Sequence, residues 1–397
     1  MPTCVFVLQY YYPDISGLSQ MMTDLTVQLS EEHRWDCSVI AGSSARGPVT
    51  WHRLPRTIGS VGIRRVQTIS VGKATLLHRV LESSTYYLGV LLRTALLRDV
   101  DVVICCTTPP LVAFVVALGL WFRRIPLVYY VQDLYPELLY DMGYIHNPWL
   151  MRKLTVANRL VFRRSQKVVT IGQCMADKMK SNYGLKDRSI AVVPNWSHGI
   201  APADVDPGPF VILYTGNIGL AHDFEHLPRL VQRLARCPSI QYRFVGGGQR
   251  LACVKSVFAG CGEERVEFLP HVRREDLSST IGRGHLCLVA QKEQTVGDIL
   301  PSKYYGYLAA GRPVIYMGTR KSDIGREITT HKLGYVVEHP GDVDFLAQEI
   351  RRLNADRDDL QRLCLRVADY SVSTYGLERS AREFAKAIEA IPNRDRS

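Results

Sequence analysis

Two runs of apolar strand-like segments, separated by helical patterns, restrict the fold of this chain more than any other feature. The first run comprises residues 3–10, 37–42, 101–106, 126–131, 167–172 and 189–194. The second run comprises residues 209–216, 240–248, 266–271, 285–291, 312–318 and 333–338. Because these segments are mostly apolar along their whole length, both faces of each sheet must be covered by helices. The sequence therefore predicts an α/β protein with two doubly wound parallel sheets in tandem.

The segment between the two runs, residues 195–208, is polar and rich in Pro and Gly, as linkers are. We therefore predict a first Rossmann-like domain over 1–197, a linker over 198–208 and a second Rossmann-like domain over 209–373. The remaining residues, 374–397, contain an amphipathic helix that can pack on either domain. Ligands of such sheets bind at the carboxyl ends of the strands, so a cleft between facing domains is expected.

The longest apolar run, residues 102–122, approaches the length of a membrane-spanning helix. Pro109 and Pro110 split it into a short β-branched half and a short helical half, which predicts a buried strand followed by a core helix. The ten cysteines form neither a CxxC pair nor a Cys/His cluster at zinc spacing, and the chain begins without a signal-peptide pattern. These features predict a cytoplasmic protein without disulfides or structural zinc.

Positive charge is concentrated in the first half of the chain. Residues 1–200 carry a net charge of +9 out of +11 for the whole sequence. Within this half, residues 149–164 have a helical pattern that places Arg152, Arg159 and Arg163 in one stripe. Two interpretations are open, a solvated helix face or a surface that rests on anionic lipid headgroups.

Glycines follow the first strand of each predicted domain, Gly17 in the first and Gly216 with Gly219 in the second. A glycine at a strand-to-helix turn lets a phosphate or sugar approach the backbone amides and the positive end of the helix. A purely structural turn is the alternative. The segment FVGGGQRL, residues 244–251, lacks the third glycine of GxGxxG, which argues against a dinucleotide-dependent dehydrogenase.

A short helix is predicted over residues 302–310, between the start signal at Pro301 and the stop signal at Gly311. Its free amides and the charge of Lys303 suit a diphosphate. The alternative is a packing helix with a surface lysine. The interior Gly306 costs about 1 kcal/mol relative to alanine, which indicates that some group lies close to the helix backbone.

Five motifs resemble, in their order and spacing, family 4 glycosyltransferases of the GT-B fold, and the WbuB-like enzymes of bacterial surface polysaccharide and exopolysaccharide synthesis in particular. They are YYVQDLYPE (129–137), VVPNWSHG (192–199), LYTGNIG (213–219), FVGGGQRL (244–251) and LPSKYYGYLAAGRPV (300–314). The resemblance covers nearly the whole chain. It implies that the second domain holds a nucleotide-diphosphate sugar and the first domain an acceptor. It also implies retention at the anomeric carbon, no obligatory metal, and a C-terminal helix that crosses back to the first domain.

The resemblance also implies roles for individual residues. The helix that begins at Ser302 corresponds to the one that points at the donor diphosphate, and backbone groups around His271 and Val272 correspond to those that hold the base. The donor-binding residues implied are Gly216, Asn217, Gly219, Gly247, His271, Val272, Leu300, Pro301, Ser302 and Lys303. The acceptor-binding or sugar-binding residues implied are Tyr12, Gly17 and Glu137.

Three residues are expected to act in catalysis: Asp133, Asp298 and Lys303. Asp133 follows a first-domain strand, where the family commonly places a polar residue beside the transferred sugar; a helix cap is the alternative. Many members carry two glutamates separated by seven residues, and these positions are Asp298 and Gly306 here. Asp298 is then expected to contact hydroxyls of the donor sugar or ribose, and Gly306 removes a side chain that other members present to the ribose.

The phosphate turn also departs from the family. The Arg and Lys that many members carry there correspond to about Asn217 and His222. Another cation must therefore balance the phosphate charge. Lys303 is the best remaining candidate, and Arg312 is the second.

The sequence thus predicts a retaining hexosyl- or N-acetylhexosaminyl-transferase that uses a nucleotide-diphosphate sugar, first of all a UDP-sugar, without metal or other cofactor. The expected acceptor is a lipid-linked saccharide, reached from the cytoplasmic face of the membrane by a peripherally bound protein. A nucleotide-sugar epimerase of the same fold is one alternative, although such enzymes usually need paired carboxylates and a His. A nucleic-acid-binding protein is another, but the basic residues lack interleaved aromatic residues or a known motif.

Overall fold

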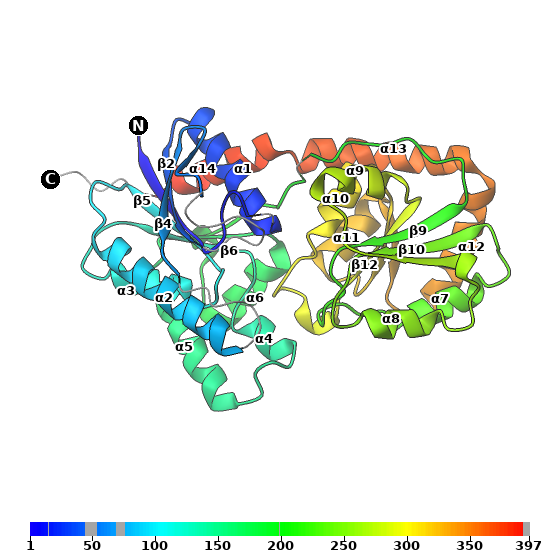
Figure 1. Ribbon diagram of the computed structural model, residues 1–397, viewed down its shortest axis with the longest axis horizontal. Coiled ribbons are helices and arrows are strands. Elements are labelled where there is room, and N and C mark those ends of the chain that lie inside the picture. Colours follow the sequence, from blue (N-terminus) through cyan, green and yellow to red (C-terminus); the bar gives the residue numbers. More distant parts are fainter. Residues whose placement is uncertain (15, 44–53, 69–75, 198, 392–397) are drawn as a thin grey trace. The chain divides into compact units, whose positions relative to one another are not determined.

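The computed structural model describes residues 1–14, 16–43, 54–68, 76–197 and 199–391, which form two compact units (Figure 1). The N-terminal unit consists of Met1–Pro194, Gly297–Ile299 and Leu377–Ser397. The C-terminal unit consists of Asn195–Val296 and Leu300–Gly376. Both units are built on a parallel sheet, as the strand pattern predicts.

The sheet of the N-terminal unit has the strand order β3-β4-β2-β1-β5-β6-β7-β8. Its strands are β1 (Thr3–Val7), β2 (Asp36–Gly42), β3 (Thr57–Ile58), β4 (Val61–Val66), β5 (Val102–Cys106), β6 (Leu127–Val131), β7 (Lys167–Thr170) and β8 (Ile190–Val192). All neighbours pair in parallel except β3 and β4, which pair antiparallel at the edge. Six of these strands confirm the predicted run. The edge pair went unpredicted because it is short and mixes polar with apolar residues.

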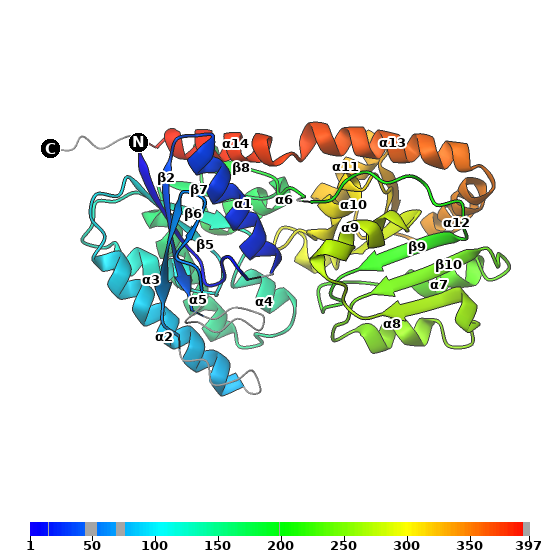
Figure 2. The ribbon, with the colours of Figure 1, turned by 45° about the horizontal axis from the view of Figure 1, so that its top comes forward.

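Eight helices accompany this sheet among the described residues. They are α1 (Gly17–Glu31), α2 (Leu76–Ala95), α3 (Val112–Gly119), α4 (Glu137–Asp141), α5 (Pro148–Arg164), α6 (Gln173–Tyr183), the 3-10 helix η2 (Asp187–Ser189) and α14 (Leu377–Glu389). Helix α3 packs between α2 and α5, while α1 packs against α14 (Figure 2). The run 102–122 is confirmed as a strand, β5, followed by a short helix, α3. In the described part of the chain, no helix combines the length and hydropathy needed to cross a bilayer.

The sheet of the C-terminal unit is parallel throughout, in the order β11-β10-β9-β12-β13-β14. Its strands are β9 (Phe210–Thr215), β10 (Ile240–Val245), β11 (Val266–Leu269), β12 (Leu286–Ala290), β13 (Val314–Met317) and β14 (Gly334–Val337). Its helices are α7 (Leu227–Arg233), α8 (Leu251–Val257), η3 (Glu263–Arg265), α9 (Arg274–Gly282), η4 (Glu293–Thr295), α10 (Lys303–Ala309), α11 (Asp323–His331), α12 (Pro340–Ala355) and α13 (Arg357–Thr374).

The two faces of this sheet are covered by separate apolar clusters. Along β9, Phe210, Ile212 and Tyr214 belong to one cluster, and Val211 and Leu213 belong to the other. Successive side chains of a strand point to opposite faces, so a strand covered on both sides must be apolar throughout. This is the physical origin of the continuous apolar runs in the sequence.

The segment predicted as a linker, 198–208, requires correction, because residues 195–208 belong to the C-terminal unit and pack on it. The backbone amide of Ala203 donates to the carbonyl of Ala310 at 3.3 Å. The carbonyl of Asp204 accepts from Arg312, and that of Asp206 lies 2.8 Å from Nε2 of His285. Backbone carbonyls thus hold this segment, and side-chain composition does not reveal them. Residue 198 itself, and residues 392–397 at the end of the chain, lie outside the described residues.

Arg312 anchors this segment from inside the C-terminal unit. Its side chain is fully buried, and Nη2 donates to the carbonyls of Asp204 and Gly282, each at 2.6 Å. We predict that Arg312→Met lowers the free energy of unfolding by about 2–4 kcal/mol, because the carbonyls of Asp204 and Gly282 each lose a charge-assisted hydrogen bond. Urea denaturation measures this change. Arg283→Met, at an exposed neighbouring position, is the matched control, and equal stability of the two variants would contradict the assigned role.

Candidate active site

Two glycine-containing connections meet at the carboxyl ends of β9 and β10. Gly216 has φ +100°, and its amide donates to the carbonyl of Val245 at 2.8 Å. Gly246 has φ +139°, and a Cβ there would lie 2.2 Å from the carbonyl oxygen of Gly216. The amide of Ile218 donates to the carbonyl of Gly247 at 2.7 Å. These positions require glycine because two backbones touch and because left-handed φ values disfavour side chains.

Lys303, the first residue of α10, extends toward this turn. Its ammonium nitrogen lies 3.7 Å from the centre of the Tyr214 ring and donates to the Tyr214 hydroxyl. A Cβ on Gly216 would be 3.8 Å from Cε of Lys303. Burial lowers the pKa of Lys303 to about 7. Among the described residues, no carboxylate is paired with this ammonium.

His222 lies beside Lys303, with Nε2 at 3.4 Å from the ammonium nitrogen. Nδ1 of His222 accepts from the Gly219 amide at 2.9 Å. Burial and the charge of Lys303 lower the pKa of His222 to about 4, so this side chain is neutral at pH 7. The turn after β9 therefore carries the ammonium of Lys303 and a neutral His222, and the guanidinium of Arg250 donates to the backbone carbonyl of His222.

Other residues expected to bind the donor lie around the same end of the sheet. A Cβ on Gly247 would be 3.7 Å from Nε2 of His271, which is exposed after β11 together with Val272. Asn217 lies close to Gly219, because a Cβ there would approach Nδ2 of Asn217 to 2.9 Å. The candidates at the start of α10 are Leu300, Pro301 and Ser302, of which Ser302 is exposed. The fold thus gathers the connections after β9, β10 and β11 that were expected to form a donor site.

The structure changes the roles that the sequence suggested for two residues in and after α10, Arg312 and Gly306. Arg312 cannot support Lys303, since it precedes β13 at the amino end of the strand and its guanidinium donates to the carbonyls of Asp204 and Gly282 and to Sγ of Cys364. Gly306 is explained by packing, because a Cβ there would lie 3.2 Å from Cδ1 of Ile200 and 3.8 Å from Cδ1 of Ile281. The group close to the helix backbone is therefore an apolar side chain from the segment before β9.

Asp298 belongs to the N-terminal unit, where its carboxylate is fully buried. The ammonium of Lys178 lies 2.7 Å from Oδ1 of Asp298 and 2.9 Å from Oδ2 of Asp141. The backbone carbonyl of Asp298 accepts from the amide of Leu134 at 2.8 Å. Burial and Asp141 raise the pKa of Asp298 to about 8, against the opposing effect of Lys178. A contact between Asp298 and a sugar hydroxyl, as the resemblance implies, requires this buried cluster to open.

Asp133 follows β6 in the N-terminal unit and is partly buried. Its amide donates to Oγ1 of Thr107 at 3.4 Å, and its carboxylate shares a hydrogen bond with Tyr135. Burial raises the pKa of Asp133 to about 6. The helix-cap alternative is not supported, because Pro136 is the N-cap of α4 and no side chain caps that helix.

The three acceptor candidates differ in accessibility. Tyr12 is 40% exposed, and Gly17, the first residue of α1, has open space around its Cα. Glu137 is buried, and its Oε1 accepts from the hydroxyl of Tyr183 at 2.6 Å and from Nδ2 of Asn182 at 3.3 Å. In this structure, therefore, only Tyr12 and Gly17 are open to a ligand.

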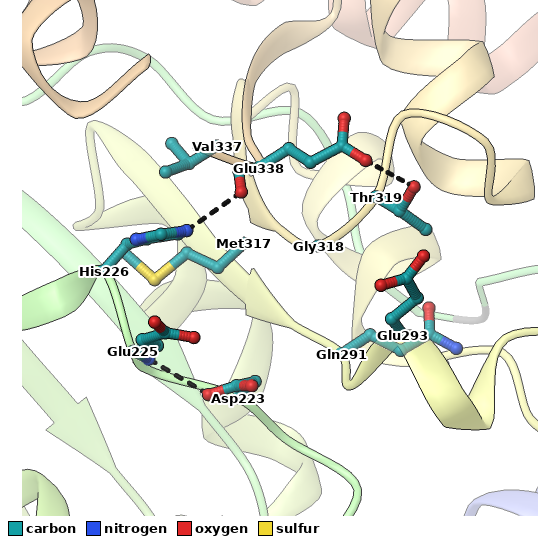
Figure 3. Close-up of a pocket in the computed structure, with 10 residues that line it drawn as sticks. All are labelled: Asp223, Glu225, His226, Gln291, Glu293, Met317, Gly318, Thr319, Val337 and Glu338. Carbon is teal, nitrogen blue, oxygen red and sulfur yellow. Dashed lines mark hydrogen bonds between the residues drawn. The ribbon is translucent and has the colours of Figure 1, made fainter. Parts of the chain in front are cut away.

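A pocket of about 130 Å³, which was not predicted, opens at the carboxyl ends of β12, β13 and β14 (Figure 3). Its lining includes Asp223, Glu225, Glu293 and Glu338, and Oε1 of Glu338 accepts from the hydroxyl of Thr319 at 2.6 Å. Four carboxylates disfavour the anionic phosphates of a nucleotide. Lys303 does not line this pocket, so we do not assign the donor diphosphate to it.

The solved structures most informative here share the fold at low identity. They include a sucrose-phosphate synthase from Thermosynechococcus elongatus (TM-score 0.70, 14% identity, 98% of both chains). They also include the Anabaena protein HepE in complex with UDP and glucose (TM-score 0.66, 15% identity, 98% of this chain and 100% of that one). A third is WaaG, a glycosyltransferase involved in lipopolysaccharide biosynthesis (TM-score 0.68, 15% identity, 98% and 100%). These likenesses show the GT-B fold.

Curated relatives match part of the chain. A putative colanic acid biosynthesis glycosyl transferase, WcaI of Escherichia coli K12, is 27% identical over 50% of this chain and 52% of its own length. A probable glycosyltransferase, WbjE of Pseudomonas aeruginosa, is 23% identical over 61% of this chain and 63% of its own length. The match thus spans between half and two thirds of each relative.

The family comparison covers most of both units. Residues 16–196 match the glycosyl transferase 4-like domain, and residues 209–356 match the glycosyl transferases group 1 domain. The order of the two domains agrees with the order of the five motifs along the chain. The chain therefore belongs to the family 4 glycosyltransferases of the GT-B fold.

Proposed function

We propose that this protein transfers a hexosyl or N-acetylhexosaminyl group from a UDP-sugar to a lipid-linked saccharide during the synthesis of a surface polysaccharide. The observation that carries the proposal is Lys303, a half-buried cation beside the glycine turn at Gly216 that pairs with no carboxylate of the described chain. The fold neighbour HepE is complexed with UDP and glucose, and TarM with UDP, which supports the choice of a uridine nucleotide. A polysaccharide product is supported by WaaG, which is involved in lipopolysaccharide biosynthesis, and by WcaI, a putative colanic acid biosynthesis glycosyl transferase.

The proposed reaction breaks the bond between the anomeric carbon and the diphosphate oxygen and forms a bond from that carbon to an acceptor hydroxyl. Negative charge develops on the departing diphosphate, and the ammonium of Lys303 stabilises it in a partly dehydrated site. We propose a front-face displacement with retention, in which the hydroxyl proton moves to the departing phosphate. Asp133, ionised above pH 6, stabilises positive charge that develops on the sugar ring.

Membrane attachment is proposed from the outer face of α5. Seven of the exposed side chains of this helix form one arc that mixes basic and apolar residues. They are Trp149, Arg152, Lys153, Val156, Arg159, Leu160 and Arg163. Lys153 also lies over the Trp149 ring, 3.8 Å from its centre. Such a face fits the boundary between anionic headgroups and acyl chains, so we propose that the protein binds peripherally to the cytoplasmic face of the membrane.

We predict that changing Arg152, Arg159 and Arg163 together to Gln weakens binding to vesicles with anionic lipid by about 100-fold at low salt. Each Lys or Arg near an anionic surface contributes about 1 kcal/mol, and screening reduces this contribution in high salt. Vesicle sedimentation measures the effect. A triple variant of exposed arginines in the C-terminal unit, at Arg236, Arg283 and Arg362, is the control. If both triple variants bind like the unmodified protein, α5 is not the attachment surface.

We also propose that transfer needs no metal ion, as the resemblance implies. The leaving diphosphate would then depend on Lys303 for charge stabilisation. Transfer measured in excess chelator should equal transfer in buffer alone. A loss of more than tenfold that Mg²⁺ or Mn²⁺ restores would show that a metal ion shares this role.

A further inference from the structure

An apolar cavity of about 120 Å³ lies inside the N-terminal unit, apart from every residue assigned to the donor. Its walls come from the β5–α3 connection, from α3, from β6 with the connection that follows it, and from α5. The lining residues used below are Leu111, Phe114, Tyr135, Leu154, Asn158 and Val161. Most of its lining side chains are aromatic or aliphatic, so the cavity suits a hydrocarbon better than a sugar.

The cavity adjoins the proposed sugar-binding end of the N-terminal sheet. Tyr135 lines the cavity and also shares a hydrogen bond with Asp133. Both residues follow β6, and ligands of parallel sheets bind at this carboxyl end. A molecule whose polar head lies at Asp133 could therefore place an attached chain in the cavity.

The amide nitrogen of Asn158 in the cavity wall already has hydrogen-bond partners. Nδ2 of Asn158 donates to the carbonyl of Tyr135 at 2.7 Å and to the hydroxyl of Tyr183 at 3.1 Å. Apolar cavities of roughly 150 Å³ stay dry and bind a molecule the size of benzene. The present cavity thus has room for about five carbons, which is one branched unit of an isoprenoid chain.

The entrance of the cavity is apolar and continues onto the surface. Leu111 at the rim is 45% exposed and has φ +70°, a left-handed conformation that a leucine rarely adopts. Leu118 lies two turns further along α3 on the same face and is also exposed, and Trp121 and Phe122 follow with 64% and 94% exposure. Helix α5, which carries the basic outer face, supplies the opposite wall through Leu154.

We propose that this cavity binds the hydrocarbon chain of the lipid-linked acceptor, at the end next to its head group. The inference rests on the proposed function, because it adds the lipid part to an acceptor whose saccharide part is placed at Asp133. Phe114, Leu154 and their neighbours in the cavity would then contact the hydrocarbon and select acceptors that carry a lipid.

The test measures binding of farnesyl diphosphate, below its micellar concentration, to the full chain by calorimetry. Leu154→Trp fills the cavity from a half-buried position, and Phe114→Asn makes its wall polar. Val156→Trp, on the exposed face of the same helix, is the matched control. We expect both cavity variants to bind farnesyl diphosphate at least tenfold more weakly, whereas Val156→Trp should bind like the unmodified protein.

Three results would overturn the proposal. Equal binding by all variants would show that the farnesyl chain binds outside the cavity. If inorganic pyrophosphate competed for binding as well as farnesyl diphosphate does, only the head group would be bound. A loss in Val156→Trp as large as in Leu154→Trp would assign binding to the outer face of α5. UDP binding by the same variants is measured in parallel. Its absence from the unmodified protein would refute the proposed donor, and the farnesyl result would still decide whether the cavity binds a hydrocarbon chain.

Discussion

Replacing Lys303 with Met is expected to weaken the binding of UDP by about 10–100-fold. A charge-assisted hydrogen bond to a phosphate contributes about 1.5–3 kcal/mol. The neighbouring His222 is neutral at pH 7 and cannot replace the charge of Lys303. Calorimetry with the unmodified protein and with Lys303→Met measures the change. Lys332→Met, at an exposed position in the same unit, should bind UDP normally. Unchanged affinity in Lys303→Met would contradict the binding of the diphosphate by Lys303, on which the proposed function depends.

Loss of binding in this variant should not reflect unfolding. Because the pKa of Lys303 is lowered to about 7, its charged form is disfavoured in the folded protein. This unfavourable contribution to the free energy of unfolding is complete below pH 7 and disappears as the pH rises toward the unfolded pKa. Met at this position should therefore leave the protein at least as stable at pH 7.

The same pKa predicts proton uptake when the diphosphate binds. At pH 8 most Lys303 side chains of the free protein are neutral, and a bound diphosphate favours the ammonium form. Titration calorimetry at pH 8 in buffers of different ionisation enthalpy should therefore show uptake of close to one proton by the unmodified protein. Lys303→Met should show none.

Replacing Asp133 with Asn is expected to lower kcat for sugar transfer by about 100-fold, with a small effect on donor KM. Removing one preorganised electrostatic group from an active site costs about this much. Because the pKa of Asp133 is raised to about 6, activity should rise as the pH increases through 6, and this rise should vanish in the variant. Exposed Asp177 supplies the matched control, Asp177→Asn. Transfer at the unmodified rate by Asp133→Asn would restrict this residue to a structural role.

Unfolding should again be excluded as the cause. Burial disfavours the ionised carboxyl of Asp133, and this unfavourable contribution is complete above pH 6 and absent below the unfolded pKa of about 3.8. Asn carries no charge, so Asp133→Asn should be at least as stable at pH 7. A thermal unfolding measurement of the variant checks this point.

The strands and the glycine turns could be predicted because their causes are local. A strand covered on both faces must be apolar throughout, and backbone contact at Gly216 and Gly246 requires glycine. Helix α10 was predicted to within one residue at each end, since Pro301 and Gly311 mark its limits. The boundary predicted at residue 374 between the second domain and the C-terminal helix was less accurate. Helix α13 continues to Thr374, and α14 begins only at Leu377.

The contacts that long-range folding creates could not be predicted. Nothing near Asp298 in the sequence indicates that Lys178 pairs with it, and nothing near Gly306 indicates that Ile200 packs against it. Arg312 appeared to be a candidate for phosphate binding because composition does not show that backbone carbonyls surround it. A charged residue in a motif can thus be predicted to matter, whereas its partner depends on which segments the fold brings together.

The central claim is that the C-terminal unit binds a nucleoside diphosphate at Lys303. Calorimetric titration of the full chain with UDP, GDP, ADP and TDP tests it most directly. We predict binding with a clear preference for one base, first of all uracil. Folded protein that binds none of the four nucleotides would contradict the claim.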